Sequence, residues 1–302
     1  MSTPAERFDY VPCTACVCGA ALAPGAPVVE KRFAWGPVRF VTCAACGTRV
    51  QSPRIATASV AAWYDSERYQ QARGADEGPY LDYLAEEPGR QAEARARLQR
   101  DLRTLLPARG RVLEVGCATG SLLAVLRDAG HEVVGIELSA SFAASARRLN
   151  GLELRVMDFE ALAEEPAGFD LVLMLGTVSN LAAPVAHFAK VRRLLRPGGT
   201  FYCNLPVADA WPARLYGERY WMYAPSVCNF MTEAGMRAAL TRAGFGVIEV
   251  ATDVQRPTFA KLAGHLRLRG LYPWLARHGL AGRQLPCSLP VPGIKVIRAR
   301  GE

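Results

Sequence analysis

The chain has 302 residues, of which 50% are hydrophobic and 21% are charged. This composition is typical of a packed globular protein and excludes an intrinsically disordered or collagen-like chain. Lys and Arg together number 36 against 28 Asp and Glu, which gives a formal net charge of +8. The excess favours anionic ligands, but no concentrated polybasic arm of the kind found in many nucleic-acid-binding proteins accompanies it.

No run of 18 apolar residues occurs, and the first residues lack the apolar core of a signal peptide. We therefore expect a cytoplasmic protein without a membrane span. Thiols stay reduced in that compartment, so the nine cysteines are expected to be metal ligands or buried thiols rather than disulfides.

Five of the cysteines fall within the first 46 residues, in two groups that each end in glycine and that flank a strand-like stretch at 28–42. This pattern is typical of a zinc ribbon, in which two knuckles give four thiolates to a tetrahedral ion. The second pair is Cys43 and Cys46, and the first consists of two of Cys13, Cys16 and Cys18. Zinc held by four cysteines has no open position, so its role would be structural. The alternative is a loop with unpaired thiols.

From residue 111 onward, apolar runs of strand length alternate with amphipathic helical stretches. Apolar strands joined by helices predict a doubly wound parallel sheet that is covered on both faces. One expected helix, 184–196, ends in arginines followed by Pro-Gly-Gly, which favours a helix end there. The expected strands are 111–115, 132–137, 153–157, 169–175 and 200–205.

A turn of small residues, 116–120, follows the first expected strand, and a helix opens at Ser121. Small residues let the backbone pass close to a ligand, whose polar part meets the free amides at the helix start. The second strand ends at Glu137, where a carboxylate can accept hydrogen bonds from both hydroxyls of a ribose. The third strand ends in Met157 and Asp158, and an acid at this place suits an adenine amino group. Capping or solvation is the alternative role of both acids.

Five segments resemble, in order and spacing, the successive motifs of the class I S-adenosylmethionine-dependent methyltransferases over roughly residues 95–255. They are VLEVGCATGSLL (112–123), VVGIELS (133–139), VMDFEAL (156–162), FDLVLMLGTVSNL (169–181) and LLRPGGTFYCNLP (194–206). The cysteine-rich start and the segment WYDSERYQ (63–70) resemble a subgroup with an N-terminal zinc-binding region, many of whose members act on small molecules in specialised metabolism.

The resemblance implies an α/β fold with a doubly wound, seven-stranded, mostly parallel sheet. The final GIKVIRARGE would be its antiparallel last strand, beside a sixth strand at about 246–252. Ala118 stands where a glycine is frequent in the family, a change that costs little if the φ angle of Ala118 is negative. The residues implied in cofactor binding are Glu114, Gly116, Cys117, Ala118 and Gly120 for the methionine part, Glu137 for the ribose, Leu138, Asp158 and Phe159 for adenine, and Leu175 with Gly176 for the methionine amine.

The acceptor side lacks an obvious base. Related sequences often have a Glu-His pair after the fourth strand and a histidine in a later segment. Here the first place holds Ser179 and Asn180 and the second reads PSVCNF (225–230), and none of these side chains takes a proton at neutral pH. Of the four histidines, His265 and His278 come first as candidates, although a lone histidine is more often structural.

Three explanations remain: an acceptor nucleophilic enough to react without a base, help from a tyrosine or acid, or another use of the cofactor. We favour proximity with polar positioning of the acceptor, because alignment alone can supply much of the rate acceleration. The positioning residues would be Asn180 and Asn204, and the candidate helpers are Tyr69, Asp209, Tyr220 and Tyr223.

Two later segments bear on the acceptor. The aromatic segment 207–231 follows the fifth strand, where it would form a substrate lid or pack over the sheet edge, and a lid would suit an aromatic, flat acceptor. The basic and apolar segment 257–285 could contact an anionic substrate or a membrane surface. The more ordinary interpretation of 257–285 is a helical insertion with a solvated face.

The sequence thus predicts three regions: a zinc-ribbon-like region (1–60), connecting helices that cap the cofactor site (61–110) and a methyltransferase core (111–302).

We expect methyl transfer from S-adenosylmethionine to a small-molecule acceptor. One alternative is an RNA methyltransferase, but nucleic acid is the less favoured partner, because the fourth strand lacks the Asp/Asn-Pro-Pro-aromatic motif of base methylation. Another alternative is a cofactor-binding protein that does not transfer methyl groups.

Overall fold

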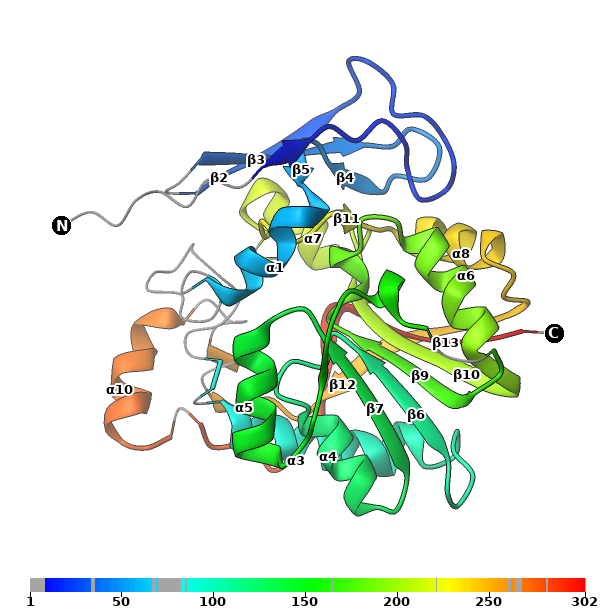
Figure 1. Cartoon of the computed structure of the whole chain (residues 1–302). Coiled ribbons are helices and arrows are strands. Elements are labelled where there is room, and N and C mark those ends of the chain that lie inside the picture. The colour runs from blue at the N-terminus through cyan, green and yellow to red at the C-terminus, as the bar shows by residue number, and fades with distance from the viewer. Residues whose placement is uncertain are drawn as a thin grey trace.

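A seven-stranded sheet forms the centre of the molecule, with the strand order β12-β13-β10-β9-β6-β7-β8 (Figure 1). The computed structural model describes residues 9–33, 36–66, 69, 83–84, 86–163, 166–220, 222–259, 262–263, 268–280 and 282–301. The strands of this sheet are β6 (Arg111–Val115), β7 (Glu132–Glu137), β8 (Arg155–Val156), β9 (Phe169–Leu175), β10 (Leu195–Pro206), β12 (Val247–Gln255) and β13 (Leu289–Arg300). Strands β6 to β10 pair in parallel, whereas β13 is antiparallel to both β10 and β12. The predicted fold class is confirmed.

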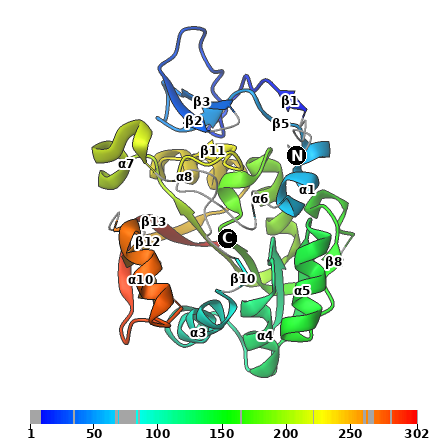
Figure 2. The same cartoon turned by 90° about the vertical axis from the view of Figure 1, so that its left-hand side faces the viewer.

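Helices cover both faces of this sheet (Figure 2). Along β9, Leu171 and Leu173 pack with α3 and α4, while Val172 and Met174 pack with α6 and α8. This alternation buries each strand on both sides, which explains its continuous apolar sequence. The helices are α3 (Glu87–Arg97), which continues as a π-helical turn η1 (Leu98–Leu102), α4 (Ser121–Asp128), α5 (Ala140–Asn150), α6 (Pro184–Leu194) and α8 (Glu233–Arg242).

The N-terminal strands gather at one end of the molecule (Figure 1). The stretch 28–42 contains two antiparallel strands, β2 and β3, which belong to a four-stranded sheet with the order β11-β4-β3-β2. Strand β11 comes from the aromatic segment 207–231, so this sheet joins the N-terminal region to a segment about 180 residues further along the chain. The elements are β1 (Tyr10–Val11), β2 (Val28–Phe33), β3 (Gly36–Thr42), β4 (Arg49–Gln51), β5 (Arg54–Ile55), α1 (Thr57–Asp65) and β11 (Asn229–Phe230).

Several bounds differ from the expected ranges. Strand β8 lies at the sheet edge and has two residues rather than five, because it pairs only with β7. Helix α6 ends at Leu194, two residues before its expected end, since β10 begins at once. The remaining elements are η2 (Phe159–Ala161), η3 (Val178–Asn180), α7 (Trp211–Tyr216), η4 (Gly217–Arg219), η5 (Arg269–Leu271) and α10 (Tyr272–Arg277). None of the helices in the described part of the chain has the length and apolarity needed to cross a bilayer.

Candidate functional site

The turn after β6 approaches its neighbours closely. Gly116 has φ +70°, and a Cβ atom there would lie 2.6 Å from Thr177 Oγ1, so a side chain has no room. Gly120 has φ +70° as well and precedes α4. Ala118 has φ +49°, so a negative φ, the condition under which an alanine would cost little here, is not met. An alanine in the left-handed region costs about 1–2 kcal/mol, and this strain lies in the part of the turn predicted to hold the cofactor.

Glu137 lies at the carboxyl end of β7, and its side chain contacts the turn at 116–120, called the glycine-rich turn below. Its Oε2 accepts a hydrogen bond from the backbone N–H of Ala118 (2.8 Å), and its Oε1 accepts one from Ser139 (3.0 Å). Burial raises the pKa of Glu137 more than these hydrogen bonds lower it. The carboxylate thus supports the strained turn, and each oxygen keeps a second lone pair for a hydroxyl of a ligand.

Glu114 lies on β6, one strand away from Glu137. It is buried, and no hydrogen-bond partner of its Oε2 occurs among the described residues. Burial and the nearby Glu137 charge raise the pKa of Glu114 to about 8. A buried carboxyl group without a partner is costly, and the cationic methionine portion of S-adenosylmethionine would supply the missing donor. Together with the glycine-rich turn, Glu114 therefore fits this cofactor.

Glu87, which the sequence did not single out, holds the same turn from the other side. This buried residue of α3 accepts hydrogen bonds from the hydroxyls of Thr119 (2.6 Å) and Ser121 (2.7 Å) and from Asn150 Nδ2 (2.8 Å). Burial acts to raise the pKa of Glu87, but these donors and Arg90 outweigh it, so the pKa is lowered. The hydroxyls of Thr119 and Ser121 on either side of Gly120 were the available signal, but their partner Glu87 is 32 and 34 residues away.

On the expected adenine side, Asp158 caps the short helix η2 by accepting a hydrogen bond from Glu160 N (2.7 Å). Capping, which the sequence left open for this residue, thus occupies one of its oxygens. Phe159 is buried and stacks on His187, with ring centroids 5.7 Å apart. Lys190 of α6 donates to the Phe159 carbonyl (2.6 Å), so α6 holds this turn in place. Leu138, next to Glu137, is half-buried.

The end of β9 carries the pair expected at the methionine amine. Gly176 has φ +68°, and its N–H donates to Asn204 Oδ1 (2.8 Å). Asn204 Nδ2 donates to Asp253 Oδ2 (2.8 Å). Both polar atoms of Asn204 are thus engaged inside the protein, which favours a role in holding Gly176 over the expected contact with the acceptor.

The loop after β9 is fixed by elements far away in the sequence. The carbonyl of Ser179 accepts from Cys228 N (2.8 Å), that of Leu181 from Asn229 Nδ2 (2.8 Å) and that of Ala182 from Arg54 Nη1 (2.9 Å). Asn180 itself is half-buried, and its amide donates to the Gly176 carbonyl (3.4 Å). The N-terminal region therefore contributes directly to the support of the expected acceptor side.

The tyrosines differ in their surroundings. Tyr220 and Tyr223 are fully buried with Phe40 and Phe230, and Tyr223 OH is hydrogen-bonded by Arg49. Burial raises the pKa of both phenols. This packing favours the alternative in which the middle of the aromatic segment packs as core rather than forming a substrate lid. Neither phenol is therefore suited to act as a base.

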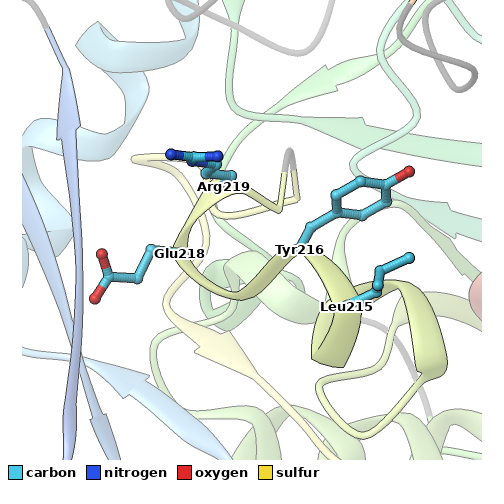
Figure 3. A pocket seen from close by; sticks show the side chains of 4 residues that line it. All are labelled: Leu215, Tyr216, Glu218 and Arg219. Atoms are coloured by element: carbon cyan, nitrogen blue, oxygen red, sulfur yellow. The ribbon is translucent and has the colours of Figure 1, made fainter.

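The start of the aromatic segment is exposed, with Trp211 61% and Leu215 67% accessible. A pocket of about 650 Å³ lies on α7 and η4, lined by Leu215, Tyr216, Glu218 and Arg219 (Figure 3). None of these lining residues belongs to the set expected to bind the cofactor. The expected acid Asp209 has another use, since its carboxylate accepts from Glu233 N at the start of α8 (3.3 Å).

Tyr69 lies nearer to the residues expected to bind the cofactor. Its ring packs edge-on against Tyr64 (4.7 Å between centroids) and contacts Phe142 of α5 (6.3 Å). Asp65 at the end of α1 accepts a hydrogen bond of 2.5 Å from Ser139 Oγ, the residue that caps α5. The connecting segment is thus attached to the end of β7, beside Glu137.

The three histidines within the described residues give no base at this edge. His131, just before β7, accepts a hydrogen bond at Nδ1 from Gly110 N (3.0 Å). His187 packs on Phe159, and His278 contacts Trp274 (4.8 Å between ring centroids). His265 lies outside the described residues.

Four cysteines converge between the N-terminal strands and α8. The Sγ atoms of Cys16, Cys18, Cys43 and Cys46 all lie within 4.8 Å of one another. Two of the separations are 3.6 Å (Cys16–Cys46) and 3.7 Å (Cys18–Cys43). A tetrahedron with Zn–S bonds of about 2.3 Å has edges of about 3.8 Å, whereas a disulfide requires about 2.05 Å. The donor set therefore fits a structural zinc ion, and Cys13 does not belong to this group.

The cysteine cluster is docked on the core. Thr232, which caps α8, donates to the Cys46 carbonyl (2.6 Å), and Arg242 at the other end of α8 donates to the Val17 carbonyl (2.9 Å). Cys16, Val17 and Cys43 belong to the same buried cluster as the core side of α8. The cluster therefore fixes the N-terminal strands to the sheet.

A family model described as "Methyltransferase domain" matches residues 89–250, more than half of the chain. The chain belongs to this family. The match includes β6 to β10 and therefore the glycine-rich turn, Glu137 and Gly176. The resemblance that the sequence motifs predicted is thus confirmed.

Curated relatives match the same region. A ubiquinone biosynthesis O-methyltransferase from Cereibacter sphaeroides is 33% identical over 130 residues, which are 41% of this chain and 50% of the relative. A malonyl-[acyl-carrier protein] O-methyltransferase from Enterobacter lignolyticus is 34% identical over 144 residues, which are 45% of this chain and 55% of the relative. The chain thus spans about half the length of the curated relatives it matches.

Solved structures support the fold. A SAM-dependent methyltransferase from Thermotoga maritima, described as a possible histamine N-methyltransferase, is similar with a TM-score of 0.50 and 20% identity, over 73% of this chain and 93% of that chain. A SAM-dependent methyltransferase from Archaeoglobus fulgidus is similar with a TM-score of 0.50 and 15% identity, over 72% and 98%.

Proposed function

We propose that the protein transfers the methyl group of S-adenosylmethionine to a small-molecule acceptor. The observation that carries this proposal is the group of buried acids around the glycine-rich turn: Glu137 at the end of β7, and Glu114 on β6, whose Oε2 has no partner among the described residues. Glu137 would accept hydrogen bonds from the ribose hydroxyls, and Glu114 would face the positive methionine part. Leu138 and Phe159 would enclose adenine, with Asp158 at its edge.

The cofactor, when bound, supplies a methyl group that its sulfonium charge already activates. The protein's task is to align an acceptor atom with that methyl carbon and to exclude water. In the transfer, a bond forms between the acceptor atom and the methyl carbon, the carbon–sulfur bond breaks, and its electron pair stays on sulfur. A protonated acceptor releases its proton to solvent or to a nearby group, since Ser179 and Asn180 cannot take it at neutral pH.

We further propose that the acceptor is a hydroxyl- or carboxyl-bearing molecule, because both relatives are named O-methyltransferases. Zinc held by Cys16, Cys18, Cys43 and Cys46 would be structural in this protein. The N-terminal region supports the acceptor loop through Arg54, so its contribution to the reaction would be to hold that loop. Residues 1–60 and 61–110 would thus form the acceptor wall and the cover of the cofactor.

The test uses calorimetry with S-adenosylhomocysteine. We expect the wild-type protein to bind it and Glu137→Ala to bind it at least about ten-fold more weakly, since a hydrogen bond to a charged group is worth about 1.5–3 kcal/mol. Glu132→Gln is the matched control, because Glu132 lies at the opposite end of β7 and is exposed. No binding by zinc-loaded wild-type protein would overturn the proposal. Labelled S-adenosylmethionine with phenols and carboxylic acids as acceptors then tests transfer, and binding without any transfer would favour a different use of the cofactor.

A further inference from the structure

A chain of buried hydrogen bonds runs from α3 to the end of β9. Arg97 donates from Nη1 and Nη2 to the two carboxylate oxygens of Asp253 (3.0 and 3.3 Å). Asp253 also accepts from Asn204 Nδ2 (2.8 Å), and Asn204 Oδ1 accepts from Gly176 N (2.8 Å). Arg97, Asp253 and Asn204 are each no more than 9% exposed. Since a carboxylate only accepts hydrogen bonds, the amide of Asn204 has one possible orientation, with its oxygen toward Gly176.

This orientation determines where the Leu175 carbonyl points. The Leu175–Gly176 peptide is trans, so its N–H and C=O point in opposite directions. The N–H points to Asn204 on β10, and β6 lies on the other side of β9. The Leu175 carbonyl therefore points toward β6. Thr177 Oγ1 confirms this direction, because it lies 3.3 Å from Leu175 O and 3.1 Å from Val115 O at the end of β6.

We infer that Asn204, held by Asp253 and Arg97, is a positioning residue that turns the Leu175 carbonyl toward the ammonium group of the cofactor's methionine part. This inference rests on the proposed function. The Leu175 carbonyl lies beside the glycine-rich turn, since Thr177 also limits the space at Gly116. A carbonyl oxygen fixed there accepts a hydrogen bond from an ammonium group without reorganisation when the ligand binds.

Helix α3 contacts both the glycine-rich turn and the Asp253–Asn204 pair. Glu87 at its start binds the turn at Thr119 and Ser121, and Arg97 at its end binds Asp253. The ten residue steps between them span about 15 Å of helix. Burial acts to raise the pKa of Asp253, but the charge and hydrogen bonds of Arg97 lower it by more. The pKa is therefore lowered overall, and the carboxylate stays ionised at neutral pH.

The test compares two ligands that differ in the amino-acid part. S-adenosylhomocysteine carries the ammonium group, whereas 5′-methylthioadenosine has the same nucleoside and thioether without it. We expect Asn204→Leu, which removes both amide hydrogen bonds at similar volume, to weaken binding of S-adenosylhomocysteine about ten-fold, or about 1.4 kcal/mol, and to leave binding of 5′-methylthioadenosine within about two-fold of wild type. Cys203→Ala is the control, a buried neighbour on β10, and should leave both affinities unchanged.

If the role of Asn204 is solely structural, the leucine variant will bind both ligands equally more weakly or will differ from wild type only in a lower melting temperature. Either result would overturn the inference. If the leucine variant does not fold, Asn204→Ser serves for the same comparison, because its shorter side chain cannot reach both Gly176 and Asp253. Failure of the proposed function is a separate result, since wild-type protein would then bind neither ligand.

Discussion

The carboxylate of Glu87 accepts a hydrogen bond of 2.6 Å from the hydroxyl of Thr119, and thereby fastens α3 to the glycine-rich turn 32 residues further along the chain. The same carboxylate also accepts from Ser121 and Asn150 around the start of α4, and from Arg90 of its own helix. The shape of the turn thus depends on a residue outside the motif that contains it.

Glu87→Gln should destabilise the protein by about 1–3 kcal/mol, because an amide NH₂ then faces hydroxyl donors in a buried place. The free energy of unfolding in urea measures this change. The pKa of Glu87 is lowered in the folded protein, so its stabilising effect is present above the unfolded pKa and is lost as the pH falls through the folded pKa. The difference between wild type and variant should therefore be constant near neutral pH and shrink in acid. Equal stabilities at pH 7 would contradict this prediction.

Ala118→Gly should stabilise the protein by about 0.5–1 kcal/mol. Alanine at φ +49° is strained, and glycine relieves that strain although it makes the unfolded chain more flexible. Ala144→Gly is the matched control, because Ala144 is exposed within α5 and should lose about 1 kcal/mol there. Urea unfolding of both variants checks the signs. Two losses of the same size would refute the strain at Ala118.

Glu114→Gln should change how stability depends on pH. The pKa of Glu114 is raised to about 8, so folding keeps it protonated while the unfolded chain ionises. Stability due to this group is complete below the unfolded pKa and falls as the pH rises from about 4.5 to about 8. The glutamine variant should lack this fall. Thermal unfolding of both ligand-free proteins across this pH range measures it, and parallel curves would argue against a buried neutral carboxyl.

Cys18→Ser should lose most of its bound zinc, whereas Cys13→Ser should keep one zinc per chain. The reason is the geometry of the thiols, since Cys18 lies 3.7 Å from Cys43 and Cys13 is outside the group of four. Metal content after purification, and the thiolate absorption of cobalt-substituted protein, both report the site. Removal of zinc by a chelator should also lower the melting temperature, since the cluster docks on α8. Zinc retained in Cys18→Ser and lost in Cys13→Ser would reverse the assignment.

Asn180→Ala should lower turnover several-fold and leave the affinity for S-adenosylhomocysteine unchanged. Asn180 lies after β9 on the expected acceptor side, and its amide only weakly contacts the Gly176 carbonyl (3.4 Å). Steady-state kinetics and calorimetry separate the two effects. Unchanged kinetics would remove Asn180 from the acceptor site.

The sequence was sufficient for the doubly wound sheet with its antiparallel last strand and for the turn at 116–120 with Glu137 at the end of the next strand. These features are local, because the apolar strands repeat with the helices between them, and Glu137 and the glycines lie at the ends of such strands. Composition and spacing also brought all five N-terminal cysteines into consideration, as candidates for four ligand places. The choice between Cys13, Cys16 and Cys18 stayed open at that stage, since all three fit a knuckle in sequence.

Only the tertiary structure decided the contacts between distant segments. Strand β11 pairs with β4 about 180 residues away, which buries Tyr220 and Tyr223 and removes them from the open edge of the sheet. Glu87 meets Thr119, and Asn204 turns to Gly176, because packing brings helix ends and strand ends together. The φ angle of Ala118 follows from the same closure of the turn by Glu137. A periodic pattern specifies which face of an element is buried, whereas the partner of a polar side chain depends on how the whole chain packs.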